Sequence, residues 1–566
     1  MRRLSSFGVA LICIGLDANP GLAQSAAPAG TSNAQPPAQS QPATAAQPQS
    51  PAQPSPDPAT AQPPATAQAP ATAQPPDQQQ PPDQQQPNDQ QQPADPAAAQ
   101  PPDQSRPAPQ TPGVRPGAVK VSDTATVGGY GSVRYEANTL EEPKPSGFDF
   151  RRFVLTTDAT PNDRLQAYIE VEFERLGEIE VERAVERFDN GVKFAEELEG
   201  GNGGEISMEQ MWGQFKFSDP FSVRFGMILP PVGRFNMNHD DDRWNIPRRS
   251  LVDRNAPVLP VRAAWSELGI GALGTVAVGK SGQLSYQGYV VNGALLDFGI
   301  EKVVESEGNE PAIIKIASET SLKRGPVNGE GGVRAGTWRV GYSPTLTTDF
   351  GFSGYIGGYV PDFLEGDERT EEVRDIDGRL TSIGIDGLWK YGDFAVEGEY
   401  IHTDFGNTDR VVNAFIDTVT GSTGIAPLAG AEGTEAEFAI KDLTPSRHGF
   451  WVEGRYRFWR EKWKDNFLGR GFEDPQLIGV VRYERVTLRD AIEEVTIENG
   501  EIERGDAETL RQERTTFALA YRPMQTVVFS VAVEFNRRLE GPVLVFPRGF
   551  PERRYTSILA GMAFGF

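Results

Sequence analysis

The segment Leu165–Glu174 reads Leu-Gln-Ala-Tyr-Ile-Glu-Val-Glu-Phe-Glu, and it decides the fold class. Apolar residues occupy every second position from Leu165 to Phe173, and Gln166, Tyr168, Glu170 and Glu172 lie between them. Successive side chains of a strand point to opposite faces, so this alternation indicates a strand with one apolar face and one polar face. Ten such residues also match the length of a tilted strand that crosses a bilayer.

The same two-residue period recurs along the chain, for example from Phe450 to Phe458 and from Phe529 to Phe535. Counting these segments gives about sixteen strands, the number typical of wide, water-filled barrels. We predict strands at 126–136, 148–158, 164–175, 205–217, 221–229, 264–279, 283–292, 336–344, 349–360, 379–390, 394–404, 447–458, 476–487, 513–523, 527–538 and 554–566.

The connections between these strands alternate in length. Short turns such as 218–220 and 391–393 alternate with long polar stretches such as 293–335 and 405–446, which is typical of outer-membrane barrels. The exception is 459–475, a long connection where a short turn is expected, and it could contain two further strands. Unpaired backbone groups are costly inside a bilayer, so we predict an all-β fold in which the strands close into an antiparallel transmembrane barrel.

The last strand alternates up to the chain terminus. Ile558, Met562 and Phe566 share one face, and Phe566 is the last residue given. This ending resembles the C-terminal strand that the assembly machinery of the outer membrane recognises. It favours the outer membrane as the location and membrane lipid as a partner.

The N-terminal part differs in composition from the barrel. Residues 1–23 have a basic start and a short apolar core, which predict a signal peptide rather than a membrane anchor. Cys13, the single cysteine, lies in that core, and Ile12 before it argues against a lipoprotein signal. Residues 24–117 are rich in Pro, Ala and Gln, so we predict a disordered linker, either a simple spacer or a tether that contacts the cell wall. The barrel is predicted over 118–566.

Three passages resemble the phosphate-selective porin family (porin O and P). They are Phe150–Leu155, the run from Gln210 to Gly233, and Pro475–Arg485. The resemblance implies a sixteen-stranded and usually trimeric diffusion channel for small hydrophilic solutes. Phosphate selectivity in that family depends on lumenal arginines and lysines. The mixed, acidic strand faces of this chain depart from that pattern, so we do not carry phosphate specificity over.

A locally basic loop at 230–263 holds six of the twelve residues that we predict to line or constrict the pore. In porins of this type the third long loop often folds into the lumen and narrows it. An arginine fork suits carboxylate or phosphate, so these arginines would either favour anions or pin the loop through pairs with aspartates and wall glutamates. The six candidates in the loop are Arg234, Arg243, Arg248, Arg249, Arg254 and Arg262.

The other six candidates lie on strands, at positions whose side chains point inward in the predicted register. Two are basic and four are acidic. The acidic majority would suit cations or neutral solutes. These candidates are Arg134, Arg224, Glu170, Glu172, Glu397 and Glu399.

Other kinds of chemistry have little support in the sequence. His239 beside Asp240–Asp242 could bind a divalent cation, but a solvated acidic loop is the more ordinary interpretation, so we predict no metal site and no cofactor. A net charge of -24 does not favour nucleic acid. We therefore expect a passive outer-membrane porin and not an enzyme. The alternative is a scaffolding barrel that sheathes a partner or links the envelope to the cell wall.

Overall fold

The computed structural model covers the barrel part of the chain. The described residues are 117–140, 146–175, 179–188, 191–200, 205–255, 258–305, 313–327, 334–361, 364, 366–367, 372–373, 376–423, 435–441, 444–491, 495–498, 501–504, 508–541 and 553–566. The predicted signal peptide, 1–23, and all of the predicted linker except Gly117 lie outside them, so both stay predictions.

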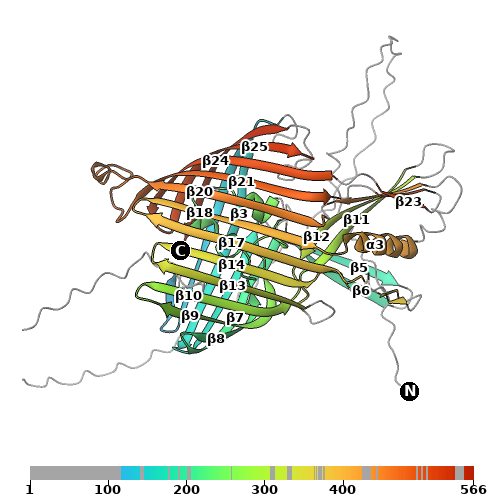
Figure 1. Ribbon diagram of the computed structural model, residues 1–566, viewed down its shortest axis with the longest axis horizontal. Helices are drawn as coiled ribbons and strands as arrows, with labels where there is room; N and C mark the ends of the chain where they lie inside the picture. Colours follow the sequence, from blue (N-terminus) through green and yellow to red (C-terminus); the bar gives the residue numbers. More distant parts are fainter. Residues whose placement is uncertain are drawn as a thin grey trace, which may run out of the picture. The chain divides into compact units, whose positions relative to one another are not determined.

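Sixteen long strands, each antiparallel to its neighbours, form a closed barrel (Figure 1). The barrel closes where the first long strand pairs with the last, from Tyr130 opposite Gly565 to Asn138 opposite Ser557. The strands are β2 (Ala125–Asn138), β3 (Gly147–Asn162), β4 (Leu165–Glu174), β7 (Glu205–Ser218), β8 (Phe221–Ile228), β9 (Glu267–Val278), β10 (Gly282–Asn292), β13 (Arg334–Thr345), β14 (Thr348–Gly358), β17 (Arg379–Tyr391), β18 (Phe394–Phe405), β20 (Ser446–Arg457), β21 (Gln476–Ala491), β24 (Glu508–Met524), β25 (Val527–Glu540) and β26 (Arg554–Gly565). Each predicted strand overlaps one of them, so the predicted fold class is confirmed. A short strand, β1 (Val119–Ser122), pairs with the start of β2.

The long connection 459–475 adds no strands to the barrel. Its described residues form turns and one 3-10 helix, η3 (Glu461–Trp463). Trp459 and Trp463 meet edge to face with their ring centroids 5.6 Å apart, and the hydroxyl of Tyr521 donates to the carbonyl of Leu468. The prediction of two further strands here is therefore wrong. The connection forms turns instead, which contact one another and Tyr521 of β24.

The long connections at the other end of the barrel contain more structure than the sequence predicts. A hairpin, β5 (Ile179–Phe188) with β6 (Gly191–Gly200), lies in one of them. A five-stranded sheet combines β11 (Leu295–Glu305), β12 (Ile313–Lys323), β19 (Glu435–Lys441), β22 (Val495–Glu498) and β23 (Glu501–Arg504), and β12 pairs with β19 in parallel. The remaining elements are β15 (Gly366–Asp367), β16 (Glu372–Val373) and α3 (Thr408–Thr423). Figure 1 shows β5, β6, β11, β12, β23 and α3 together at this end. Several of these strands are short or irregular in their alternation: β12 does not alternate, and β19 alternates over only seven residues.

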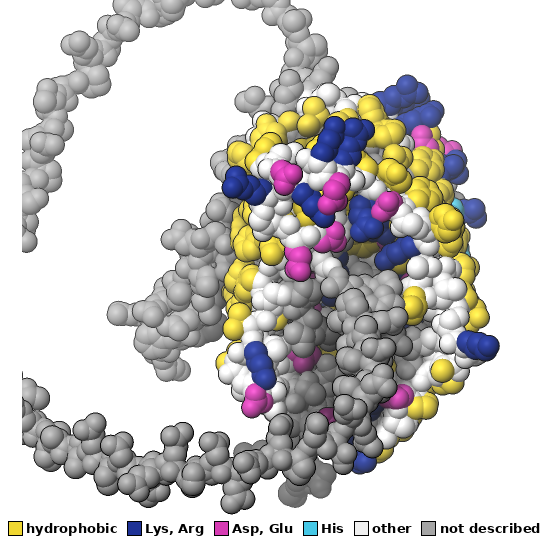
Figure 2. All heavy atoms as spheres, turned by 90° about the vertical axis from the view of Figure 1, so that its left-hand side faces the viewer, with side chains coloured by type: hydrophobic (Ala, Val, Ile, Leu, Met, Phe, Trp, Pro, Cys, Tyr) yellow, Lys and Arg dark blue, Asp and Glu magenta, His cyan; other side chains and the backbone are white. Residues whose placement is uncertain are grey.

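The two faces of each barrel strand differ in the way that a membrane requires. On β25, Phe529, Val531 and Phe535 are 43–54% exposed on the outside, whereas Ala532 and Glu534 on the inner face are 3% and 0% exposed. Figure 2 shows hydrophobic side chains around the outside of the barrel and many of the charged ones toward its middle. An apolar outer wall over a polar interior is the pattern of a barrel in lipid. None of the described helices is long and apolar enough to cross a membrane.

The closing pair of strands depends on the last residue and on a glycine. The backbone N–H of Phe566 donates to Gly129 O, and that of Gly129 donates to Phe566 O, both at 3.0 Å. The ring of Phe566 stacks on Phe153 with centroids 5.9 Å apart. A Cβ on Gly129 would lie 2.1 Å from the carbonyl oxygen of Val154, so the close approach here requires glycine.

The outward position of Val531 gives a direct test of the lipid-facing wall. Replacing Val531 with arginine should lower the free energy of unfolding of the barrel in lipid vesicles by about 2–4 kcal/mol, because a charge would then face hydrocarbon near the middle of the strand. Urea unfolding followed by tryptophan fluorescence measures this change. Gln525→Arg in the turn between β24 and β25 is the matched control and should change the stability little. Equal effects of the two substitutions would contradict the placement of this wall.

Candidate functional site: a charged loop inside the barrel

The connection between β8 and β9 folds into the barrel and contacts opposite walls. We call it the inner loop: residues 229–266, described at 229–255 and 258–266, with the short helices α1 (Arg234–Met237), η1 (Asp241–Arg243) and η2 (Leu251–Asn255). The N–H of Gly233 donates to Ser353 Oγ of β14 at 3.1 Å. Across the barrel, Ser132 Oγ of β2 donates to Asp241 Oδ2 at 2.7 Å. The predicted position of the third loop in the lumen therefore matches the structure.

Arg234 inserts its guanidinium among three carboxylates of one wall. Its Nη1 lies 2.5 Å from Asp349 Oδ1 of β14 and 3.5 Å from Asp386 Oδ1 of β17, and its Nε binds Glu397 of β18. Burial by itself lowers the pKa of Arg234, but the carboxylates of Glu397 and Asp349 raise it by more, so the pKa lies above its ordinary value. Arg234 is thus a charged anchor between three strands.

The first turn of α1 is capped by a wall glutamate. The backbone N–H groups of Arg234 and Phe235 donate to Glu399 Oε2 at 2.6 and 2.9 Å. The other oxygen of Glu399 accepts from the indole Nε1 of Trp451 at 2.8 Å. These N–H groups have no partner within the helix, so Glu399 satisfies donors that would otherwise be buried without one.

Arg248 fixes the loop to the opposite wall, and the neighbouring Arg249 pairs within the loop. Arg248 lies between Glu136 of β2, which it binds through Nη2, and Glu534 of β25, whose Oε2 is 3.1 Å from Nε. Burial lowers the pKa of Arg248, but Glu534 and Glu136 raise it by more. Arg249 Nε lies 3.4 Å from Asp241 Oδ1 within the loop.

Asp241 joins the loop to β3 as well as to β2. Its Oδ2 lies 3.2 Å from Nε of the fully buried Arg152. Burial raises the pKa of Asp241, but Arg152 and Arg249 lower it by more, so the pKa lies below its ordinary value. Here the loop supplies the carboxylate and the wall supplies the arginine, whereas at Arg234 the loop supplies the arginine and the wall supplies the carboxylates.

The wall also holds the loop backbone. Arg514 of β24 donates through Nη2 to Arg249 O at 2.6 Å, and its Nε lies 2.5 Å from Glu484 of β21. Glu484 in turn accepts from the N–H of Leu251 at 3.1 Å. Arg522 donates to Trp244 O at 3.0 Å. These bonds satisfy backbone groups that have no secondary-structure partner in the loop.

An aromatic cluster fills the space between the loop and the wall. Phe235 stacks on Trp244 at 4.5 Å between centroids, and Trp244 meets Trp451 of β20 edge to face at 5.7 Å. The guanidinium of Arg482 lies 5.2 Å and 5.1 Å from the centroids of these two indoles. Glu453 binds Arg482 at 2.5 Å, so the charge over the rings is paired.

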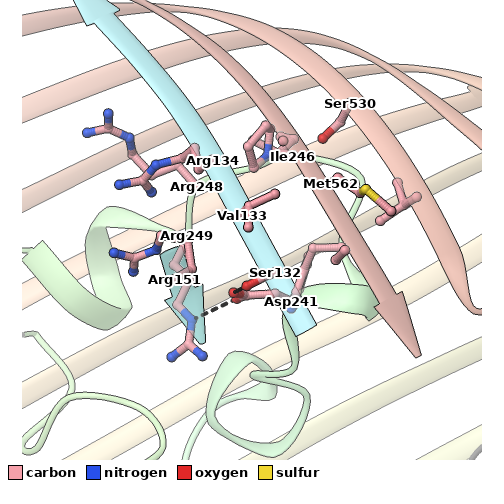
Figure 3. Close-up of a pocket in the computed structure, with 15 residues that line it drawn as sticks. Ser132, Val133, Arg134, Arg151, Asp241, Ile246, Arg248, Arg249, Ser530 and Met562 are labelled. Atoms are coloured by element: carbon pink, nitrogen blue, oxygen red, sulfur yellow. Dashed lines mark hydrogen bonds and ion pairs between the residues drawn. The ribbon is translucent and has the colours of Figure 1, made fainter. Parts of the chain in front are cut away.

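A small polar cavity remains where the loop meets β2, β25 and β26 (Figure 3). Its volume is about 30 Å³, which is room for one or two water molecules. Arginines contribute most of its charge, and Asp241 lies opposite them. Its lining includes Arg134, Arg151, Arg248, Arg249, Asp241 and Ser530.

The predicted site residues fall into groups in the structure. Eight have buried side chains: Arg224, Arg234, Arg248, Arg249, Glu170, Glu172, Glu397 and Glu399. Arg134 is half-buried, Arg243 and Arg262 are exposed, and the side chain of Arg254 lies outside the described residues. Their function in a pore stays a prediction.

The structure brings only some of the predicted residues together. Arg234 meets Glu397 and Glu399, as described above. Glu172 lies 2.8 Å from Arg152, a residue that was not predicted. Arg224 stands apart on β8, where it lies 3.8 Å from the ring centroid of Trp212.

Sequence reasoning missed several partners of these residues. Asp349 and Asp386 are the main examples, since both bind Arg234. The sequence did contain a signal for them, because each aspartate stands next to an apolar residue of an alternating strand. Phe350 and Ile385 are both 55% exposed on the outer wall, so Asp349 and Asp386 point inward. The alternation alone would therefore have predicted that both aspartates face the interior, where they bind Arg234.

Comparison with known proteins gives a fold and no family. No family model matches the chain. A protein of Aquifex aeolicus described as uncharacterized is 30% identical over 191 residues, which are 33% of this chain and 37% of that protein. The chain thus spans well under half of the length of this curated relative.

Several solved outer-membrane structures are similar in fold. OmpT of Vibrio cholerae has 10% identity and a TM-score of 0.40 over 80% of this chain and 100% of that one. OmpF of Salmonella typhi has 10% identity and a TM-score of 0.42 over 79% and 100%. An anion-selective porin from Comamonas acidovorans has 9% identity and a TM-score of 0.40 over 78% and 99%. These likenesses concern the fold alone.

The architecture itself determines the class of this protein. It has a closed barrel of sixteen antiparallel strands, an apolar outer wall and a charged interior with a loop folded into it. Only closed barrels and helices satisfy all backbone groups in lipid, and barrels of this kind belong to the outer membrane. The chain is a porin-like transmembrane β-barrel of the outer membrane.

Proposed function

We propose that the protein is a porin through which small hydrophilic solutes or ions diffuse passively, with the inner loop as the constriction. One observation supports this most: buried ion pairs fix the loop to opposite walls, through Arg234 on one side and Arg248 on the other. A loop held in this way narrows a wide lumen to a defined passage. The arginines then act mainly as anchors, and the carboxylates that they bind neutralise them.

We place the passage along the wall formed by β7, β8, β9 and β10, where the guanidinium of Arg224 on β8 donates to Gln214 Oε1. Here several inward side chains are uncharged and keep part of their surface exposed, in contrast to the buried charges around the loop. They are Gln214, Thr275, Gln283, Ser285 and Gln287. Amides and hydroxyls can replace the water around a polar solute without favouring either sign of charge. Such a lining suits small neutral or weakly charged solutes.

Membership of the porin O and P family and a trimeric assembly are parts of the same proposal. The resembling passages fall on β3, on β7 and β8 with the first residues of the inner loop, and on β21. Passive transport needs neither a cofactor nor catalysis, in accordance with the predicted absence of both. The predicted linker, 24–117, would act as a spacer or as a contact to the cell wall.

Conductance in planar bilayers tests the proposed function. The purified protein is expected to give stable, ohmic current steps that are smaller than those of a barrel of this width without a loop in its lumen. Deleting residues 240–262 should increase the step size several-fold, provided that the variant still runs as a heat-modifiable folded barrel on gels. An intact seal without current steps, from a protein that is shown to be inserted, would contradict the proposal.

The scaffolding alternative receives less support. A sheathed partner would occupy the lumen, and in the described residues the chain's own loop lies there. The stoichiometric co-purification of a second protein would still favour it.

A further inference from the structure

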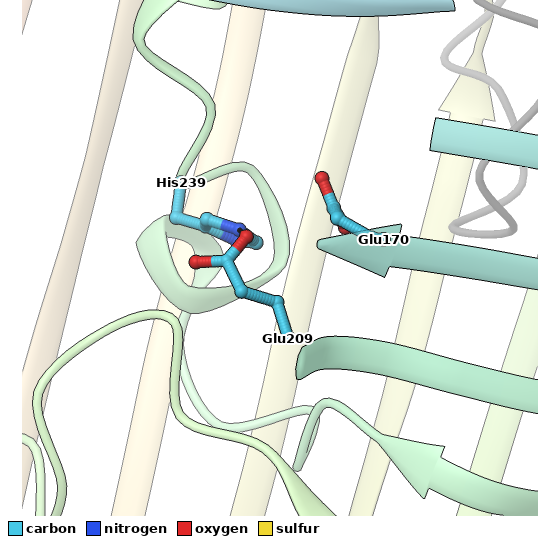
Figure 4. A group of neighbouring side chains, drawn as sticks. All are labelled: Glu170, Glu209 and His239. Atoms are coloured by element: carbon cyan, nitrogen blue, oxygen red, sulfur yellow. Dashed lines mark hydrogen bonds and ion pairs between the residues drawn. The ribbon is translucent and has the colours of Figure 1, made fainter. Parts of the chain in front are cut away.

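Three side chains from different elements converge inside the barrel, apart from the anchors of the inner loop. They are Glu170 of β4, Glu209 of β7 and His239 of the loop (Figure 4). Their exposures are 1%, 3% and 2%, and one ligand atom of each lies within 4.8 Å of the others. An imidazole and two carboxylates, all shielded from water, are a donor set that suits a divalent metal ion.

The backbone orients the histidine for this purpose. His239 Nδ1 lies 2.9 Å from Asn236 O, and because a carbonyl only accepts, Nδ1 must carry the hydrogen. Nε2 is then the ligand atom, and it lies 3.2 Å from Glu209 Oε2. Two ligands of a tetrahedral ion with bonds of about 2.0–2.1 Å are separated by about 3.3 Å, so these two atoms already have the required spacing.

A second set of contacts orients one of the carboxylates. The amide Nε2 of Gln210 donates to Glu170 Oε2 at 2.5 Å. The indole Nε1 of Trp212 donates in turn to Gln210 Oε1 at 3.3 Å. Hydrogen bonds behind the ligands are typical of metal sites, where they fix the ligand geometry and increase affinity.

The charge balance also points to a cation. Asp240 Oδ1 also lies 3.7 Å from His239 Nε2, so carboxylates of Glu209 and Asp240 both lie near the nitrogen that would bind the ion. With both glutamates ionised and the imidazole neutral, the group of three has a charge of -2. The neighbouring Arg152 is already bound by Glu172 and by Asp241. A divalent cation makes such a group neutral, which a buried site favours.

We propose that Glu170, Glu209 and His239 bind one divalent transition-metal cation, for which Zn²⁺ is the best match. The site joins the inner loop to β4 and β7, so the ion would cross-link the constriction to the wall. This inference does not depend on the proposed transport function, because it concerns binding and can be measured on protein that conducts nothing.

Titration with Zn²⁺ tests the site on the full chain in detergent. After treatment with EDTA and buffer exchange, calorimetry should show one Zn²⁺ bound per chain. X-ray absorption of the bound zinc should show nitrogen and oxygen neighbours without sulfur.

Substitutions separate this site from adventitious binding. H239A should abolish the one-to-one binding, and E170Q should weaken it at least tenfold. Q210A leaves all three ligands in place and should weaken binding about 10–100-fold through the loss of the orienting bond. H402A is the matched control, since His402 lies on a different strand and pairs with Asp404 at 2.8 Å, and it should change nothing. Unchanged binding by folded H239A, or the absence of binding by the wild-type chain, would overturn the proposal.

Discussion

Replacing Arg234 with alanine is expected to lower the free energy of unfolding of the barrel by about 3–5 kcal/mol. That is the usual cost when one partner of a buried ion pair is removed and the other charge stays behind. Here the buried Asp349 would be left without the Arg234 guanidinium, whereas Asp386 keeps its bonds to Arg339 and Glu397 keeps its bond to Arg455. Urea unfolding in lipid vesicles, followed by tryptophan fluorescence, measures the change.

The same substitution should also loosen the constriction. Without Arg234, the start of α1 loses its only side-chain ion pairs in the described residues and keeps the backbone bonds to Glu399 and Ser353, so the loop should fluctuate more and the current steps should become larger and noisier. Arg243 offers a matched control, because its side chain is 44% exposed in its pair with Asp240. R243A should cost less than about 1 kcal/mol, as exposed pairs usually do. If R234A costs no more than R243A, Arg234 is not an anchor.

The barrel could be predicted from the sequence because two solvents act on each strand. Lipid on one side and water or protein charge on the other enforce a strict alternation, and that pattern placed β25 within two residues of its observed bounds. In the five-stranded sheet, 313–323 does not alternate and 435–441 alternates over only seven residues. The same reasoning therefore left both inside polar connections, although both are strands.

The candidate site could be predicted only as a list of residue types. Charged residues on inward positions were recognisable, and Arg234, Arg248 and Glu397 are indeed buried inside the barrel. Their pairing was not, because Arg234 and Glu397 are 163 residues apart and meet only through the path of the folded loop. Whether the arginines face a passage or bind carboxylates depends on that path, and alternation carries no information about it.

Replacing both Arg248 and Arg249 with alanine is expected to shift the selectivity of the pore toward cations. The change removes two positive charges and leaves Glu136, Glu534 and Asp241 inside the barrel without them. A unit charge about 10 Å from a permeating ion changes its energy by about 1.7 kcal/mol at an effective dielectric constant of about 20. Salt screens part of this, so we expect a several-fold rise in the ratio of cation to anion permeability, measured as the reversal potential across a salt gradient.

A second pair of substitutions distinguishes lost charge from a displaced loop. Adding E136Q and E534Q to R248A and R249A removes two negative charges, and the net charge of the lumen returns to its original value. If charge alone sets the selectivity, the reversal potential should return toward that of the wild type. If the potential stays shifted and the current steps stay enlarged, the loop has moved. In the wild type Arg248 bridges Glu136 and Glu534, and the uncharged side chains of the variant cannot form that bridge. An unchanged reversal potential in the R248A/R249A variant would mean that these arginines act only as anchors of the loop and that their charge does not reach the permeating ion.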